Sequence, residues 1–349
     1  MNRLAATATA LALAAPLGLA QAQTPTTMRI AGNFSSNTKH VDLIEKPFFI
    51  ALPKLTDTNL AINYNPMDVV GVQAADALRH LRSGTFDLMS VQIGMASRDD
   101  PFFEGLDLIG VSPNMKDLRK AVEAYRPAFD QRLQARFKAK VMTLWPFGPQ
   151  VFYCNKPIKG IDDLKGLKVR VFTPSMAALV QHAGGTPVTL QFSEVYTSLQ
   201  RGVADCAVTS PTSGNTGKWP EVTTHFYPLG LSGSVQGHFM NLDYWKKFSP
   251  EQQQKLLSAF KQMEDQMWDL ADRVNDDAVN CNVGREPCKE GVKFKMQLVE
   301  VTPQDQQRVK TAVTAAVLPL WKNTCNKVDP KCTATWNETV GKVRGYKID

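Results

Sequence analysis

The sequence lacks the motifs that identify most hydrolases, metalloenzymes and nucleotide-binding enzymes. It has no G-x-S-x-G nucleophile elbow, no P-loop and no H-E-x-x-H zinc motif. It has no C-x-x-C pair, and no histidine lies near the cysteines at the spacing of zinc ligands. The five histidines are scattered along the chain: His40, His80, His182, His225 and His238. These absences argue against an enzyme, a metal site or any other cofactor, and a secreted hydrolase with Cys206 as its nucleophile is the weakest alternative.

Beyond its first residues, the sequence has no apolar run that approaches membrane-spanning length. The first residues have the pattern of a secretory signal peptide, because Arg3 precedes the apolar stretch 4–15 and an A-Q-A cleavage sequence at 20–22. Residues 1–22 are therefore predicted to be a signal peptide, and the mature chain is predicted to begin near Gln23. An exported, periplasmic protein is expected.

The sequence also lacks a dense basic segment. Its 40 Lys and Arg against 33 Asp and Glu give a net charge of +7, and the excess is spread along the chain. No run has the density of a nucleic-acid-binding patch, so no nucleic acid is expected as a partner. A mild positive field of this kind suits the attraction of small anions.

Six cysteines in an exported chain predict disulfides, because their number is even. Proximity along the sequence suggests two short-range bridges and leaves one long-range pair. Six cysteines allow 15 connectivities, so spacing alone leaves the others open. The pairs expected are Cys154–Cys206, Cys281–Cys288 and Cys325–Cys332.

Strand-like and helical segments alternate along the chain, and the second half repeats the plan of the first. This order predicts an α/β fold whose sheets are mainly parallel and flanked by helices. The expected strands are 28–31, 60–65, 86–91, 168–173, 186–190 and 204–209, and the expected helices between them are 40–55, 72–83, 175–183 and 192–201.

The length of the chain suits two domains. The sequence Pro146-Phe147-Gly148-Pro149 breaks a β-like stretch and is a candidate crossover between them. Residues 250–276 read as one helix that is long enough to lie across both domains. We expect domain I to hold residues 24–147 plus about 236–276, and domain II to hold residues 148–235 plus about 277–349, which include a disulfide-stapled C-terminal tail.

Arg170 is the first candidate for a binding residue. It lies in the stretch DDLKGLKVRV, where strand alternation places Val169 and Val171 on one face and Arg170 on the other. If that face is covered, the guanidinium needs an anion, because an unpaired buried charge is very costly. A carboxylate ligand would serve, and so would a structural ion pair; a half-exposed strand with Arg170 in water is the other alternative.

Further candidates lie where strands end, since ligands of such sheets bind beyond the carboxyl ends of strands. Each has a structural alternative: the polar ones as turn formers or hinge residues, and the tryptophans as core packing. The candidates are Asn33, Phe34, Gln92, Trp145, Gln150, Thr209, Ser210, Ser213, Asn215 and Trp219.

From about Met28 to about Ala271, the chain resembles the DctP-type substrate-binding proteins of TRAP (tripartite ATP-independent periplasmic) transporters. The most specific parts are KPIKGIDDLKGLKVRV and GGTPVTLQFSEVYTSLQRGVADCAV. The resemblance implies a two-domain clamshell in which the arginine of the first motif, here Arg170, grips the carboxylate of a small organic acid. It also implies delivery to a membrane permease that is driven by an ion gradient, usually of sodium, without ATP. A monomer is expected.

The chain departs from this family at two places. Many members carry a second arginine just after the crossover, where this chain reads LWPFGPQVFYC with Gln150. Many also read DGQENP after the second motif, where this chain reads DCAVTSPTSGN, with Thr209 or Ser210 in place of a substrate-contacting asparagine. One carboxylate clamp remains, which favours a monocarboxylate. A partly apolar or aromatic one would suit the aromatic residues Phe34, Trp145, Phe147 and Trp219, if they line the cleft. A periplasmic ligand sensor with the same clamshell is the main alternative.

Overall fold

The first sheet has five strands, and its central members are apolar and covered on both faces. In the computed structural model, which describes residues 26–349, every residue of β3 is buried, as are Met28, Ile30 and Ala31 of β1. β1 pairs in parallel with β2 and β3, whereas β10 runs antiparallel to β3 and β4. The strand order is β2 (Leu60–Pro66), β1 (Thr26–Gly32), β3 (Leu88–Gln92), β10 (Gly233–Asn241) and β4 (Ala139–Pro149).

The second sheet has six strands and is built mainly from the middle of the chain. β6 pairs in parallel with β7 and β8, whereas β5 is antiparallel to β8 and β9. A short strand near the C-terminus adds to the edge in parallel with β9. The strand order is β11 (Gln297–Leu298), β9 (His225–Tyr227), β5 (Val151–Cys154), β8 (Cys206–Thr209), β6 (Lys168–Val171) and β7 (Thr186–Thr189).

The chain crosses between the sheets at Gln150, which separates β4 from β5, and again between β9 and β10. The backbone N–H of Gln150 donates to Ser232 O at 2.6 Å, so the two crossings run side by side. The strands that cross account for the antiparallel pairs. Two of the four strand pairs are parallel in the first sheet and three of the five in the second. Residues 146–149 were expected to break the strand, but β4 continues through them to Pro149. Two prolines are tolerated there because β4 is an edge strand of its sheet.

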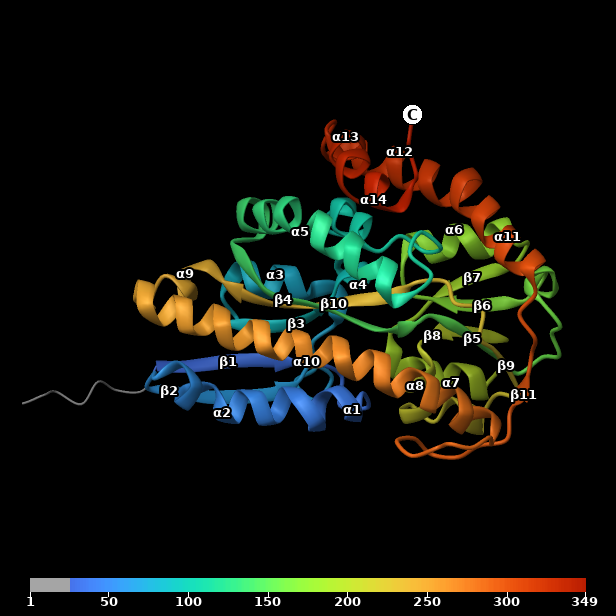
Figure 1. The fold of residues 1–349 in the computed structure, drawn as a ribbon, viewed down its shortest axis with the longest axis horizontal. Coiled ribbons are helices and arrows are strands. Elements are labelled where there is room, and N and C mark those ends of the chain that lie inside the picture. Colours follow the sequence, from blue (N-terminus) through green and yellow to red (C-terminus); the bar gives the residue numbers. More distant parts are fainter. Residues whose placement is uncertain (1–25) are drawn as a thin grey trace, which may run out of the picture.

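Helices cover both sheets (Figure 1). The helix expected at 40–55 runs from Thr38 to Thr56 and contains a π-helical segment at Val41–Glu45. The small polar residues after β8 favour a loop, but they form α8, with Ser210 as its N-cap. The main helices up to β10 are α2 (Lys46–Thr56), α3 (Ala77–Ser83), α4 (Ile93–Ala96), α5 (Met115–Phe137), α6 (Pro174–His182), α7 (Phe192–Gln200) and α8 (Pro211–Thr216).

After β10 the chain forms α9 (Leu242–Trp245) and then the long helix α10 (Pro250–Val283), which extends beyond the end expected at 276. Ser249 and Gln252 form a capping box at its start, and Gly284, in the left-handed region at φ 76°, ends it. α10 packs against β4 and α2, which belong to the first sheet and its cover, and further along the chain against α8, which follows β8 of the second sheet. It therefore lies along both sheets (Figure 1).

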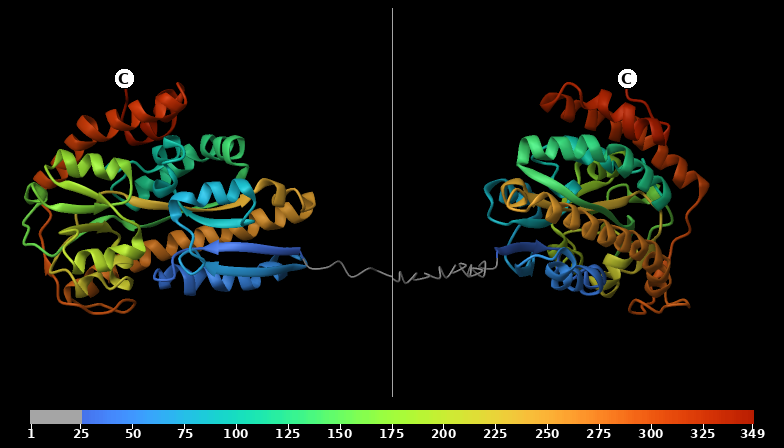
Figure 2. Two further views of the ribbon diagram at one scale, coloured as in Figure 1. Left: turned by 180° about the vertical axis from the view of Figure 1, so that it is seen from behind. Right: turned by 60° about the vertical axis from the view of Figure 1, so that its left-hand side comes forward.

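The C-terminal tail lies over α5 and α6, on the side of the molecule opposite α2 (Figure 2). Trp321 Nε1 donates to Pro101 O and Trp336 Nε1 donates to Gly105 O, both at 2.8 Å, which ties the tail to the first half of the chain. Its helices are α11 (Pro303–Ala312), α12 (Leu318–Val328), α13 (Cys332–Trp336) and α14 (Lys342–Arg344), with π-helical segments at Val313–Val317 and Asn337–Gly341.

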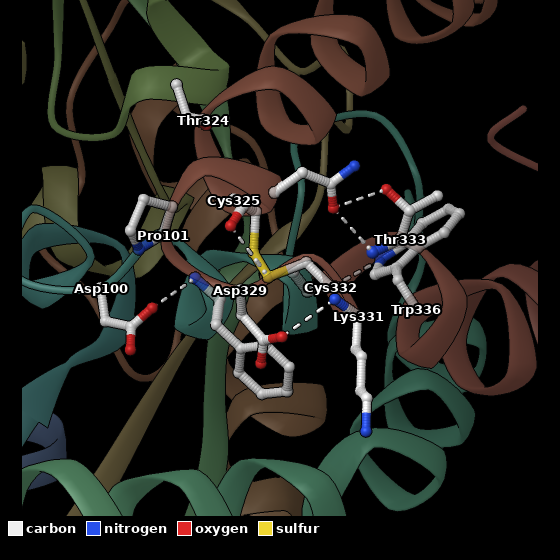
Figure 3. The surroundings of a disulfide bond; sticks show 12 residues. Asp100, Pro101, Thr324, Cys325, Asp329, Lys331, Cys332, Thr333 and Trp336 are labelled. Atoms are coloured by element: carbon white, nitrogen blue, oxygen red, sulfur yellow. Dashed lines mark hydrogen bonds between the residues drawn. A yellow bond between two sulfur atoms is a disulfide. The ribbon is translucent and has the colours of Figure 1, made fainter.

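The structure contains the three disulfides that the spacing predicts. Cys154–Cys206 joins β5 to β8, where the two residues are direct partners in the sheet. Cys281–Cys288 closes the end of α10, and Cys325–Cys332 joins α12 to α13 beside Trp336 (Figure 3). Within residues 26–349, no helix is both long and apolar enough to cross a membrane. The predicted signal peptide lies outside the described residues.

Candidate functional site

A small cavity, about 30 Å³ in volume, lies where strands of both sheets end. Phe34 follows β1 and Gln92 ends β3 in the first sheet, while Arg170 and Thr209 come from β6 and β8 in the second. Gln150 at the crossover joins the two groups. The lining residues are Phe34, Asn37, Gln92, Met95, Phe147, Gln150, Arg170, Phe172, Phe192, Thr209, Ser213, Ser234 and Gln236.

Arg170 is fully buried, with 0% of its surface exposed. Its Nε and Nη2 donate to Leu190 O at 3.1 and 3.0 Å, and its Nη1 donates to Val208 O at 2.9 Å. A guanidinium has five N–H donors, so two N–H groups have no partner among the described residues. The two carbonyls hold the side chain in place and leave donors for a ligand.

The charge of Arg170 has no counter-ion within ion-pair distance in residues 26–349. Burial lowers the pKa of Arg170 to about 9, and the carboxylate of Glu194 only partly offsets that effect. The group is still a cation at neutral pH. Aromatic faces lie close to it: its Cζ is 4.9 Å from the ring centroid of Phe172 and 5.7 Å from that of Trp219. These contacts stabilise a cation but cannot neutralise it.

Six of the eleven predicted site residues line the cavity together: Phe34, Gln92, Gln150, Arg170, Thr209 and Ser213. The other five, Asn33, Trp145, Ser210, Asn215 and Trp219, lie behind the wall or elsewhere. Asn215 does not line the cavity and bonds instead to Asn282 Oδ1 and to the backbone of Val292. Ser210 Oγ caps α8 by accepting from Ser213 N at 3.1 Å. Trp219 stacks on Phe192 and supports the wall from behind.

Three polar lining residues extend this set: Asn37, Ser234 and Gln236. Ser234 accepts a hydrogen bond from Gln92 Nε2. Ser234 and Gln236 are two apart in β10, so they share a face of that strand. That alternation was a signal in the sequence. Asn37 gives no comparable signal, because it stands five residues beyond the end of β1, at the start of α1 (Thr38–His40).

Near the cavity, hydrogen bonds across the cleft join segments that pack on the first sheet to segments that pack on the second. Glu104 Oε1 accepts from Ser175 N at 2.9 Å, at the first turn of α6, and Gln191 Oε1 accepts from Ala74 N at 3.2 Å. Burial raises the pKa of Glu104, while hydrogen bonds from Ser175 and Thr173 oppose that effect. These contacts indicate that the cleft is closed around the cavity.

The described residues offer no convincing metal site. The closest cluster is Asp277 with Cys281 and Cys288. Those two cysteines are joined in a disulfide, so neither is a thiolate ligand, and Asp277 accepts from the backbone N–H groups of Lys289 and Glu290.

Comparison with known proteins identifies the family. Residues 33–324 match the model of the bacterial extracellular solute-binding proteins, family 7, called DctP. The sialic acid-binding periplasmic protein SiaP of Vibrio cholerae is 28% identical over 170 residues, which are 47% of this chain and 50% of SiaP. The chain spans about half the length of the curated relatives it matches.

Solved structures share the fold. DctP6 of Bordetella pertussis, an extracytoplasmic solute receptor binding pyroglutamic acid, superposes with a TM-score of 0.80 at 20% identity, over 92% of this chain and 100% of DctP6. A TRAP periplasmic solute-binding protein of Desulfovibrio salexigens with bound orotic acid gives a TM-score of 0.78 at 17% identity, over 91% and 99% of the two chains. With a family model that covers most of its length, the chain belongs to family 7 of the bacterial extracellular solute-binding proteins, the DctP family of TRAP solute-binding proteins.

Proposed function

We propose that this chain is the periplasmic solute-binding subunit of a TRAP transporter and that Arg170 grips the carboxylate of a small organic acid. The observation that carries the proposal is the buried guanidinium, which is held by two backbone carbonyls and has no counter-ion among the described residues. Leaving such a charge unpaired is costly. A carboxylate accepts two parallel N–H bonds from a guanidinium and neutralises it.

A monocarboxylate suits the cavity best. Arg170 is the one cationic side chain among the described lining residues, so a second carboxylate would have no partner of opposite charge there. Phe34, Phe147, Phe172 and Phe192 supply apolar wall, which suits a partly apolar or aromatic acid. Pyroglutamic acid and orotic acid, bound by two structural neighbours, are cyclic acids with one carboxyl group each.

The mechanism is closure of a clamshell around the ligand. One lobe comprises residues 26–147 with about 236–276, and the other comprises residues 148–235 with about 277–349, whose C-terminal tail also packs on the first lobe. A ligand held by Arg170 on one side and by amides of the first sheet on the other stabilises the closed form through contacts that exist only there. The closed monomer then delivers the acid to a membrane permease that uses an ion gradient.

A thermal-shift and native mass-spectrometry screen tests the proposal. Organic acids are compared with their own primary amides, which have nearly the same shape and no charge. A ligand at a hundred times its Kd stabilises the folded state by about 2.7 kcal/mol, so an acid that binds should raise Tm by several degrees while its amide does not. Binding of neutral compounds with no response to any acid would contradict the proposal. Transport is tested by uptake of the acid into vesicles that hold the permease, with and without this protein.

A further inference from the structure

The hydrogen bonds around Asn37 determine which of its side-chain atoms is the acceptor. Asn33 Oδ1 accepts from the backbone N–H of Phe34 at 2.7 Å, so this atom is an oxygen. The amide atom of Asn37 that lies 3.0 Å from it must therefore be the donor Nδ2. The remaining polar atom of Asn37 is its carbonyl oxygen, Oδ1.

Asn37 Oδ1 has no hydrogen-bond partner within residues 26–349, although the residue is only 4% exposed and lines the cavity. Asn37 occupies the N-cap position of α1, where an asparagine usually accepts a backbone N–H of the first turn. Its side chain makes no such bond here. Burying an acceptor without a partner destabilises the folded protein by about 1–3 kcal/mol. A hydrogen-bond donor on a ligand would remove this penalty.

The neighbouring amides do not offer an equally well-defined acceptor. Gln92 Oε1 accepts from Met95 N and its Nε2 donates to Ser234 Oγ, both at 2.6 Å, so each polar atom of that amide is used. Gln236 Oε1 is also without a partner, but its other atom bonds only to the hydroxyl of Ser90, which fits either orientation of the amide. Asn37 Oδ1 is thus the unpaired acceptor that can be assigned as oxygen, because the backbone N–H of Phe34 fixes the orientation of the neighbouring amide of Asn33.

Arg170 and Asn37 enter the cavity from different sheets, one from β6 and the other from the segment after β1. We infer that Asn37 determines ligand specificity: its Oδ1 accepts a hydrogen bond from an N–H or O–H group of the ligand, while Arg170 holds the ligand's carboxylate. This inference rests on the proposed function and narrows it. The ligand class becomes monocarboxylic acids that carry a hydrogen-bond donor away from the carboxyl group, such as lactam or hydroxy acids.

Matched pairs of acids test the inference. In each pair, one acid has the donor and the other replaces it by a group of similar size without one: pyroglutamate against 5-oxotetrahydrofuran-2-carboxylate, and lactate against propionate. Affinities are measured by calorimetry for the wild type, for Asn37→Leu, and for Asn63→Leu, which changes an exposed asparagine of β2 as a control. Circular dichroism and Tm check that each variant folds.

The wild type and Asn63→Leu should bind the donor member of a pair at least tenfold more tightly. In Asn37→Leu this preference should fall to less than threefold, while the acid without a donor keeps most of its affinity, so a folding defect cannot mimic the result. Equal binding of both members by the wild type, or an unchanged preference in Asn37→Leu, would overturn the role of Asn37 and leave the carboxylate clamp standing. If no acid of any pair binds the wild type, the proposed function fails first and the inference falls with it.

Discussion

Gly94 of α4 lies directly against Thr173, the N-cap residue of α6, across the cleft between the two sheets. A Cβ atom built on Gly94 would lie 2.3 Å from Thr173 Cγ2, closer than two carbon atoms can approach. The next nearest atom, Thr173 Cβ, would be 3.4 Å away, which is ordinary contact. The closed cleft therefore depends on the missing side chain at position 94.

Gly94→Ala should weaken ligand binding, because the added methyl group holds the cleft open. Overpacking of this kind costs about 1–3 kcal/mol, which corresponds to a loss of roughly 5- to 150-fold in affinity. Adding Thr173→Ser should restore most of the affinity, since serine removes Cγ2 and keeps the hydroxyl that caps Met176 N at 3.1 Å. Calorimetry on the two single variants and the double variant measures both effects. A double variant that binds as weakly as Gly94→Ala would show that this contact does not control closure.

His40 should make the protein less stable in mild acid. Its ring stacks on Trp145 and meets the edge of Phe147, and burial lowers its pKa from 6.5 to about 4, which Glu45 only partly opposes. The unfolded chain therefore takes up a proton below about pH 6.5 that the folded chain refuses until about pH 4. The free energy of unfolding should fall by about 3 kcal/mol as pH drops through this window.

His40→Phe keeps an aromatic ring at this position and removes the titrating group, so its stability should depend less on pH between 6.5 and 4. Urea unfolding of both proteins at several pH values measures the difference. Parallel pH profiles would exclude His40 as the cause.

Glu104 should make the protein less stable as pH rises, the opposite of the effect of His40. Burial raises its pKa above the ordinary 4.5, so the folded chain holds a proton that the unfolded chain has released, and stability is lost as pH rises through the raised pKa. Glu104→Gln keeps the acceptor for Ser175 N and removes the charge. Its Tm relative to the wild type should increase from pH 4 to pH 7. A constant difference over this range would contradict the prediction.

The disulfides predict the thiol content of the protein. Without reductant, a thiol reagent should label no cysteine even in denaturant, and after reduction it should label all six. Replacing both Cys154 and Cys206 by Ala should lower the free energy of unfolding by about 2–4 kcal/mol. Labelling of Cys206 in the native, unreduced protein would instead reopen the alternative of a thiol nucleophile.

Much of the fold follows from local patterns in the sequence. Alternating apolar segments predicted most strands, and the amphipathic segment 250–276 predicted most of α10. The family predicted from the two motifs around Arg170 is confirmed by the family match. Where prediction failed, tertiary context decided: β4 passes through two prolines because it lies at a sheet edge. For α8, Ser210 and Pro211 are residues that often begin a helix, but the small polar residues that follow them favour a loop.

The candidate site was less predictable than the fold. Topology brought Arg170, Gln92 and Thr209 to one cavity, because each stands at or near the end of a strand. Asn37 could not be found in this way, since the inference about it rests on a side-chain oxygen that has no hydrogen-bond partner in the described part of the chain. The position of Asn215 was equally hidden, because its partners lie 67 and 77 residues away along the chain.

The most direct test of the account is a charge cycle at Arg170. The affinities of an organic acid and of its primary amide are measured by calorimetry for the wild type and for Arg170→Gln. Removing one partner of a buried charge pair costs roughly 2–5 kcal/mol, so the wild type should prefer the acid by about a hundredfold, and Arg170→Gln should show no preference. An Arg170→Gln protein that still prefers the acid by the same factor would contradict the carboxylate clamp.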